Sequence, residues 1–255
     1  MNFIDTHTHL YLKDIDIDID EEIKKSISLG INEFYLPSID SSYTNRMMDL
    51  KNKYPNKIKL MMGLHPTHID KDSKIEIDHI KKMLGEDEFS AVGEIGIDLY
   101  WNKKNLKNQI NIFIQQIEIA LSHKLPIVIH CRDAFDEVYK VLLNFKKDNL
   151  SGIFHCFTGT KEEAEKIIDL NFKLGIGGVV TFKNGGIDKF LNQIPLTSIV
   201  LETDAPYLAP HPHRGKRNKS SYLVIIAEKI AQIYNLPIEK IAQQTTKNAR
   251  SVFKI

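Results

Sequence analysis

The sequence is poor in cysteine and has almost no excess of charge of either sign. Two of its 255 residues are cysteines, Cys131 and Cys156, and two are too few for a disulfide framework. Lys and Arg total 34 against 33 for Asp and Glu, a formal net charge of +1. This balance excludes a protein that coats nucleic acid by bulk electrostatics, although it permits a local basic patch.

Long apolar runs are also missing. No run approaches the roughly 20 residues of a membrane helix, and the first residues, MNFIDTHTHL, lack the basic and apolar regions of a signal peptide. We therefore expect a cytoplasmic protein with reduced thiols and no membrane contact. Hydrophobic residues still make up 42% of the chain and charged residues 26%, which is typical of a globular protein and excludes disorder.

Short apolar runs alternate with longer helical patterns along the whole chain. The runs predict strands at residues 3–9, 33–37, 58–64, 90–95, 127–130, 152–157, 172–176 and 198–201. Helical spacing predicts helices near residues 21–29, 42–53, 75–84, 106–123, 134–146, 161–170 and 186–193, then 221–234 and 237–247. The acidic segment 14–20 is expected to be a loop leading into the first helix, where acids are favoured.

This alternation predicts parallel strands joined by helical crossovers. Eight such units in about 250 residues indicate an α/β protein with a (β/α)₈ TIM-like barrel. No linker rich in Pro, Gly or Ser divides the chain, so we expect a single domain over residues 1–255. An open doubly wound sheet is the alternative, because it also alternates strands and helices.

Histidines and acids gather where predicted strands end. The residues are His7 and His9 in the first strand, Glu94 in the fourth, His130 in the fifth, His155 in the sixth and Asp204 after the eighth. The carboxyl ends of barrel strands meet on one face, so these side chains should converge. A single buried histidine is more often a hydrogen-bonded core residue, and a single acid after a strand is often a helix cap. The joint arrangement favours a metal site instead.

Strand alternation refines this prediction. Residues two apart in a strand share a face, so His7 and His9 can bind one ion. Cys131 and Cys156 each directly follow a histidine. We therefore expect both cysteines to face the surrounding helices and not to be ligands.

Seven motifs together carry a family resemblance. They are residues 5–10 (DTHTHL), 63–66 (GLHP), 92–98 (VGEIGID), 129–132 (IHCR), 155–159 (HCFTG), 201–208 (LETDAPYL) and 213–218 (HRGKRN). As a set they resemble the TatD-type metal-dependent deoxyribonucleases, part of the metal-dependent amidohydrolase superfamily with its TIM-like barrel. The family usually continues the last motif with Glu-Pro, whereas Lys219 and Ser220 follow here.

The resemblance implies a role for each matching residue. His7 and His9 would hold one divalent ion together with Asp204, His130 and His155 would hold a second, and Glu94 would bridge them. Imidazole ligands favour Zn, Mn, Fe or Co over Mg, whereas TatD-like enzymes are commonly described as using Mg. The candidate metals are therefore Mg, Mn and Zn.

The positive charge of two divalent ions exceeds the negative charge of the two carboxylates. The site therefore keeps a net positive charge, which suits an anionic phosphodiester. We predict a deoxyribonuclease of exonuclease type acting on DNA or RNA by a metal-activated water. Asp204 and Glu94 would be catalytic, with Asp204 accepting the proton of the water. No protein partner is evident.

Residues outside the ligand set are expected to contact the substrate. His65 and Arg214 are the candidates for direct contact, and Glu202, two residues before Asp204, would orient a ligand. Lys103, Lys104 and Lys107 follow the fourth strand beside Tyr100 and Trp101, where aromatic rings could stack on nucleobases. A solvated basic surface is the alternative for these loops.

Two other functions stay open. The superfamily also hydrolyses carbonyl substrates, such as an amide, lactone or aminoacyl ester, and fold alone does not decide function. Many of those enzymes bridge their metals with a carboxylated lysine, whereas this chain has Glu94. The third possibility is a non-catalytic metal-binding scaffold, against which the complete ligand set argues.

Overall fold

Eight parallel strands pair in sequence order in the computed structural model, which describes residues 1–12, 18–70, 73–101 and 103–254. The strands are β1 (Phe3–Asp5), β2 (Ile31–Pro37), β3 (Ile58–Met62), β4 (Ala91–Asp98), β5 (Ile127–Arg132), β6 (Gly152–Phe154), β7 (Phe172–Ile176) and β8 (Ile199–Leu201). Each strand pairs in parallel with the next.

The two edges of this sheet meet, so the sheet forms a nearly closed barrel. The backbone N–H of Thr6 donates to the carbonyl of Leu201 over 3.0 Å. The carboxylate of Asp5 accepts the backbone N–H and the hydroxyl of Thr203, at 2.9 and 2.7 Å. The predicted barrel is confirmed, and the open doubly wound sheet is wrong.

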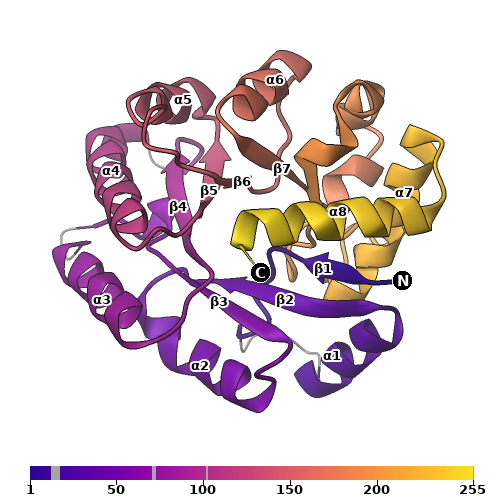
Figure 1. Cartoon of the computed structure of the whole chain (residues 1–255), viewed down its shortest axis with the longest axis horizontal. Coiled ribbons are helices and arrows are strands. Elements are labelled where there is room, and N and C mark those ends of the chain that lie inside the picture. The colour runs from indigo at the N-terminus through magenta and orange to yellow at the C-terminus, as the bar shows by residue number, and fades with distance from the viewer. Residues whose placement is uncertain (13–17, 71–72, 102, 255) are drawn as a thin grey trace.

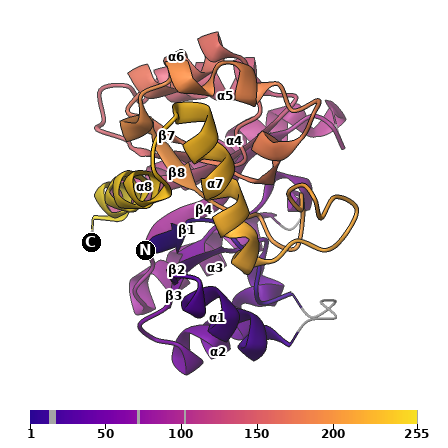
Figure 2. The ribbon, with the colours of Figure 1, turned by 90° about the vertical axis from the view of Figure 1, so that its right-hand side faces the viewer.

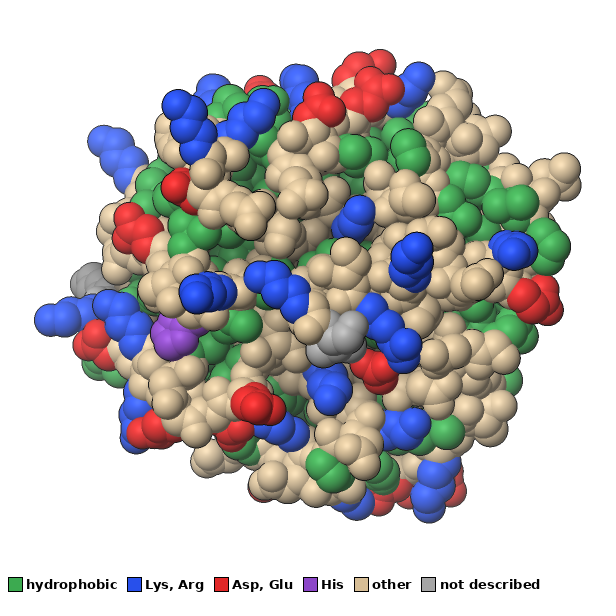
Figure 3. Space-filling view, in the orientation of Figure 1, with side chains coloured by type: hydrophobic (Ala, Val, Ile, Leu, Met, Phe, Trp, Pro, Cys, Tyr) green, Lys and Arg blue, Asp and Glu red, His purple; other side chains and the backbone are tan. Residues whose placement is uncertain are grey.

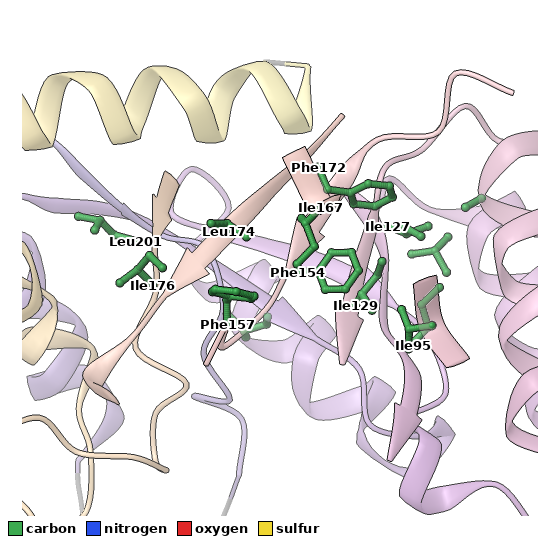
Figure 4. Packing of buried hydrophobic residues seen from close by; sticks show 14 of the residues in the cluster. Ile95, Ile127, Ile129, Phe154, Phe157, Ile167, Phe172, Leu174, Ile176 and Leu201 are labelled. Carbon is green, nitrogen blue, oxygen red and sulfur yellow. The ribbon is translucent and has the colours of Figure 1, made fainter. Parts of the chain in front are cut away.

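Helices surround the barrel (Figure 1). They are α1 (Ile19–Ser28), α2 (Thr44–Lys53), α3 (Ser73–Glu86), α4 (Leu106–Ser122), α5 (Phe135–Leu143), α6 (Lys161–Asp169), α7 (Leu223–Tyr234) and α8 (Ile238–Phe253). The first six each follow the strand of the same number. Their apolar stripes bury against the outer face of the sheet, as Ile167 of α6 does beside Phe154 of β6 and Phe172 of β7 (Figure 4).

A second, smaller apolar cluster fills the barrel itself. Strand residues that alternate with the outward ones supply most of it: Ile4, Tyr35, Met61, Ala91, Val128, Ile153 and Val200. The end of α8 adds Ala249, Val252 and Phe253, and the ring of Phe253 stacks on that of Tyr35 with centroids 3.9 Å apart. Helix α8 therefore closes one end of the barrel, beside both termini (Figures 1 and 2).

Several predicted boundaries differ from the structure. The predicted helix at 186–193 is wrong: the chain forms two single 3₁₀ turns there, Ile187–Lys189 and Leu191–Gln193, because Phe190 between them leaves helical geometry with φ −130°. Helix α8 continues six residues past the predicted end, since its apolar face extends into the barrel. Asp18 caps α1, as expected for the acidic segment, whereas residues 14–17 of that segment lie outside the described residues.

The face that carries α8 has mixed charge. Lys and Arg side chains are spread there among acidic and uncharged ones (Figure 3). Among the described residues, none of the helices has the length and apolar character needed to cross a membrane. Charged and metal-ligating side chains that could form a site gather at the opposite end of the barrel.

Candidate metal centre

His7 and His9 lie just beyond β1, which ends at Asp5 and is shorter than predicted. Nε2 of His7 is 3.1 Å from Oε2 of Glu94 and 3.8 Å from Oδ1 of Asp204. Nε2 of His9 lies 3.8 and 3.5 Å from the same two oxygens. The two histidines therefore face one space, as predicted. The N–H of Asp204 also donates to the carbonyl of His7 over 2.9 Å, which fixes these segments together.

A bulge in β4 aims Glu94 at this space. Val92 pairs with Ile127 and Ile95 pairs with Ile129, so three steps on β4 oppose two on β5. Val92 and Ile95 both pack toward the helices, and the extra residue between them turns the buried carboxylate into the barrel mouth. The prediction that Glu94 ends the fourth strand is wrong, because β4 continues to Asp98.

The second oxygen of Glu94 faces a different set of imidazoles. Oε1 lies 2.8 Å from Nδ1 of His130, 3.5 Å from Nε2 of His65 and 3.6 Å from Nε2 of His155. His65, predicted as a substrate contact, is thus a member of the cluster, with Nε2 3.2 Å from Nδ1 of His130. One buried carboxylate stands between two groups of nitrogen ligands. This arrangement suits divalent metal binding.

Outer partners hold several of these rings in place. Nε2 of His130 lies 2.9 Å from Oδ2 of Asp98, and Nδ1 of His9 lies 2.8 Å from the hydroxyl of Tyr11. Such partners fix the ring orientation of metal-binding histidines. Sequence reasoning missed both, although Tyr11 follows His9 at the same two-residue spacing that linked His7 to His9.

Glu202 is the corresponding partner of His155. It is fully buried, and its Oε1 lies 2.9 Å from Nδ1 of His155 while accepting the backbone N–H of Cys156. Gly175 packs against this carboxylate so closely that a Cβ at that position would collide with Oε2. The contact with Nδ1 of His155 is therefore the one through which Glu202 would orient this ring, as predicted.

His7 has the least satisfied ring in the centre. Its side chain is fully buried, and within the described part of the chain neither ring nitrogen has a hydrogen-bond partner of good geometry. The ring stacks on that of His155 with centroids 3.5 Å apart and planes 17° apart. An unpaired buried polar group is costly, and a cation that accepts the ring lone pair would remove this cost. The donor set present thus fits a divalent metal.

The electrostatics of the cluster point the same way. Burial lowers the pKa of His7, and nearby His155 lowers it further. Burial alone would raise the pKa of Glu94, but His155 and His7 hold it well below its usual value. Burial opposes the charge on His155 as well, yet Glu202, Glu94 and Asp204 raise its pKa to about 10. The acids therefore favour positive charge inside the centre.

The two cysteines have different surroundings. Cys131 packs against the apolar layer between sheet and helices, as predicted. For Cys156 the predicted orientation toward the helices is wrong, because β6 ends at Phe154 and the alternation of a strand no longer applies. Cys156 adopts a left-handed φ of 47°, and its Sγ lies within 4.8 Å of ligand atoms of His155 and Glu202. Burial raises the pKa of this thiol well above its usual value.

Arg214 lies outside the ligand cluster. Its guanidinium stacks over the ring of Phe182, 3.6 Å from the centroid, and both residues line a cavity of about 650 Å³. Thr158, from the segment after His155, lines the same cavity. The cavity is formed by the segments after β6, β7 and β8, which leave the barrel at the end that carries the metal centre.

The segment that departs from the family motif is held by local hydrogen bonds. Ser220 lies at hydrogen-bond distance from Thr8, with 3.0 Å between their hydroxyl oxygens. The side chain of Asn218 donates to the carbonyl of Thr203 over 2.6 Å. The segment thus packs against residues next to the metal centre without the usual Glu-Pro.

Comparison with known proteins places the chain in a family. The family model described as "TatD related DNase" matches residues 4–254. The chain is 36% identical to the uncharacterized metal-dependent hydrolase YabD of Bacillus subtilis, with 98% of each chain covered. It is 30% identical to the uncharacterized metal-dependent hydrolase YcfH of Escherichia coli K12, covering 100% of this chain and 97% of that one.

A solved structure agrees with these matches. The TatD homologue YjjV of Escherichia coli K12 superposes with a TM-score of 0.93 at 25% identity, covering 99% of this chain and 98% of that one. Both chains therefore share the barrel over their whole length. The chain belongs to the TatD family of metal-dependent hydrolases.

Proposed function

We propose that the chain is a deoxyribonuclease of exonuclease type that hydrolyses phosphodiester bonds with two divalent metal ions. The observation that carries the proposal is the placement of the Glu94 carboxylate, because its two oxygens face different groups of imidazoles. A bridging carboxylate has this geometry, and paired metals are a recurring device of phosphodiester cleavage.

The residues divide into two ligand groups. His7, His9 and Asp204 would hold one ion, and His130 and His155 the other, with Glu94 shared between them. Mg, Mn and Zn are the candidate metals. When bound, such ions supply Lewis acidity toward the phosphoryl oxygen and toward water.

Asp204 is the residue we assign to proton transfer. His155 and a hydrogen bond from His9 hold its pKa below the usual value although burial alone would raise it. The carboxylate is therefore ionised at neutral pH and able to accept a proton from the attacking water. Its Oδ1 lies 3.8 Å from Nε2 of His7 and 3.5 Å from Nε2 of His9, so the proton would be taken inside the ligand cluster.

The surroundings favour an anionic substrate. The cavity that contains Arg214 is also lined by Lys183 and His211, and of the described residues that line it none is acidic. Arginine can bind a phosphate through two parallel hydrogen bonds. We assign Arg214 to a phosphate of the substrate. His65, inside the cluster, would contact the substrate next to the metals.

A single comparison tests this proposal. The purified protein is loaded with Mg, Mn or Zn and assayed on single-stranded DNA, duplex DNA, RNA and an aminoacyl ester, with and without EDTA. We expect cleavage of DNA from one end that EDTA abolishes and added metal restores. Hydrolysis of the ester alone would favour a carbonyl hydrolase, and metal binding without turnover of any substrate would indicate a scaffold.

A further inference from the structure

Two large aromatic side chains lie exposed next to each other after β4. Trp101 is 70% exposed and Tyr100 54%, and their rings pack edge to face with centroids 5.0 Å apart. Most large apolar side chains of this protein are buried. Two neighbouring exposed rings are therefore candidates for a binding surface.

The position of this pair is fixed by a residue of the metal centre. Oδ1 of Asp98 accepts the backbone N–H groups of both Tyr100 and Trp101, each over 3.0 Å. Oδ2 of the same carboxylate lies 2.9 Å from Nε2 of His130. One buried carboxylate thus ties the aromatic turn directly to a proposed metal ligand, so the two keep a constant separation.

A cation lies against the same surface. Arg132 is two residues after His130 on β5, and its guanidinium carbon lies 3.7 Å from the ring centroid of Tyr100 and 5.9 Å from that of Trp101. The backbone carbonyl of Arg132 also accepts the N–H of Leu99 over 2.9 Å. Stacking on the ring holds the planar guanidinium in one orientation and leaves its N–H edge available for a phosphate.

We propose that Tyr100, Trp101 and Arg132 bind one unpaired nucleobase and its adjoining phosphate, in a nucleic-acid strand whose scissile bond lies at the metal centre. The inference rests on the proposed nuclease function. The exposed ring of Trp101 stacks on the base, which any base permits because each has a π-face. Arg132 binds the phosphate. A base inside a duplex is already stacked on its neighbours, so the site accepts only an unpaired one.

The only tryptophan of the chain is Trp101, so fluorescence excited selectively at tryptophan reports on this surface alone. The metal-loaded protein is titrated with a phosphorothioate oligonucleotide that resists cleavage, with the same oligonucleotide made abasic, and with a blunt duplex. We expect strong quenching by the base-containing single strand and little by the other two. Equal quenching by the abasic strand, or no binding of DNA at all, would overturn the proposal.

Variants test the two contacts separately, with binding measured by anisotropy of a labelled strand. Trp101→Ala should weaken binding about 5- to 150-fold, as expected for the loss of one base stack, and Trp101→Phe should recover most of it. Arg132→Lys should also weaken binding, because lysine cannot form the planar bidentate contact. Arg250→Lys, on α8 at the opposite barrel end, is the matched control and should bind like the parent protein.

Hydrolysis of bis-p-nitrophenyl phosphate separates this inference from the proposed function. This small diester has a single phosphate and no nucleobase, so it cannot use the base site, and the Trp101 variants should hydrolyse it at the parent rate. If the parent protein cleaves DNA but Trp101→Ala binds and cleaves DNA equally well, the base site is refuted and the nuclease stands. If the parent cleaves neither substrate, the proposed function itself fails.

Discussion

Replacing Glu202 by glutamine should weaken metal binding at His155 and spare the other group of ligands. Glutamine has nearly the same volume, and its amide oxygen can still accept the backbone N–H of Cys156 and face Nδ1 of His155. What is lost is the negative charge 2.9 Å from that ring. Because the charge makes the opposite nitrogen a stronger ligand, its loss should weaken that ion about 10- to 100-fold, or roughly 1.4–2.8 kcal/mol.

Metal content and affinity of the purified Glu202→Gln protein decide this prediction. Calorimetric titration of the metal-free protein should give one weakened site, while the site formed with His7 and His9 keeps its affinity. Gly175→Ala is an informative companion, because its Cβ would displace Glu202 without removing the charge. Glu165→Gln, an exposed change on α6, is the neutral control. Unchanged affinity in Glu202→Gln, or equal weakening of both sites, would refute the reasoning.

The remaining predictions concern five substitutions. His7→Ala should reduce the metal content by one ion, whereas Glu94→Ala should weaken the binding of both ions, and elemental analysis measures both effects. Full occupancy in Glu94→Ala would contradict the bridging role. Arg214→Ala should keep its metal and mainly raise KM, with kcat/KM for a DNA oligonucleotide lowered roughly tenfold to a hundredfold; loss of metal would be the contrary result. Cys131→Ser should leave metal content unchanged, and depletion would show that its side chain reaches the centre. Phe253→Ala should destabilise the fold by about 3–5 kcal/mol, because this buried ring stacks on the ring of Tyr35 inside the barrel. The measurement is a lower Tm. An unchanged Tm would mean that α8 does not close the end of the barrel.

The barrel and the convergence of its histidines and acids were predictable because both follow from simple periodicities. Alternating apolar runs and helical stripes fix the order of strands and helices, and the carboxyl ends of parallel strands must then meet. His130 and His155 could be placed from that rule alone. His7 and His9 converge as expected even though β1 ends before them, because their backbone continues alongside the segment that contains Asp204.

The misplaced features depend on departures from regular geometry. The bulge of β4 leaves no trace in the hydrophobic pattern, because the strand is buried on both faces and nearly every position is apolar or glycine. The turn at Cys156 follows a strand of only three residues, so alternation could not be extended to it. The role of Asp98 depends on the same bulge, which shifts the side-chain pattern of the residues that follow.

The seam between β1 and β8 couples the metal centre to the closure of the barrel. Between the other neighbouring strands the backbones pair in a parallel ladder, whereas this seam is joined by one isolated bridge, Thr8 with Ala205, and by separate hydrogen bonds such as those of Asp5 with Thr203. His7 and Asp204 lie on opposite sides of this seam. An ion bound by both residues would link the two sides of the seam between β1 and β8. Metal binding and closure of the barrel would then be one cooperative event. Removing the ion should then speed amide exchange first at Thr6, whose N–H crosses that seam.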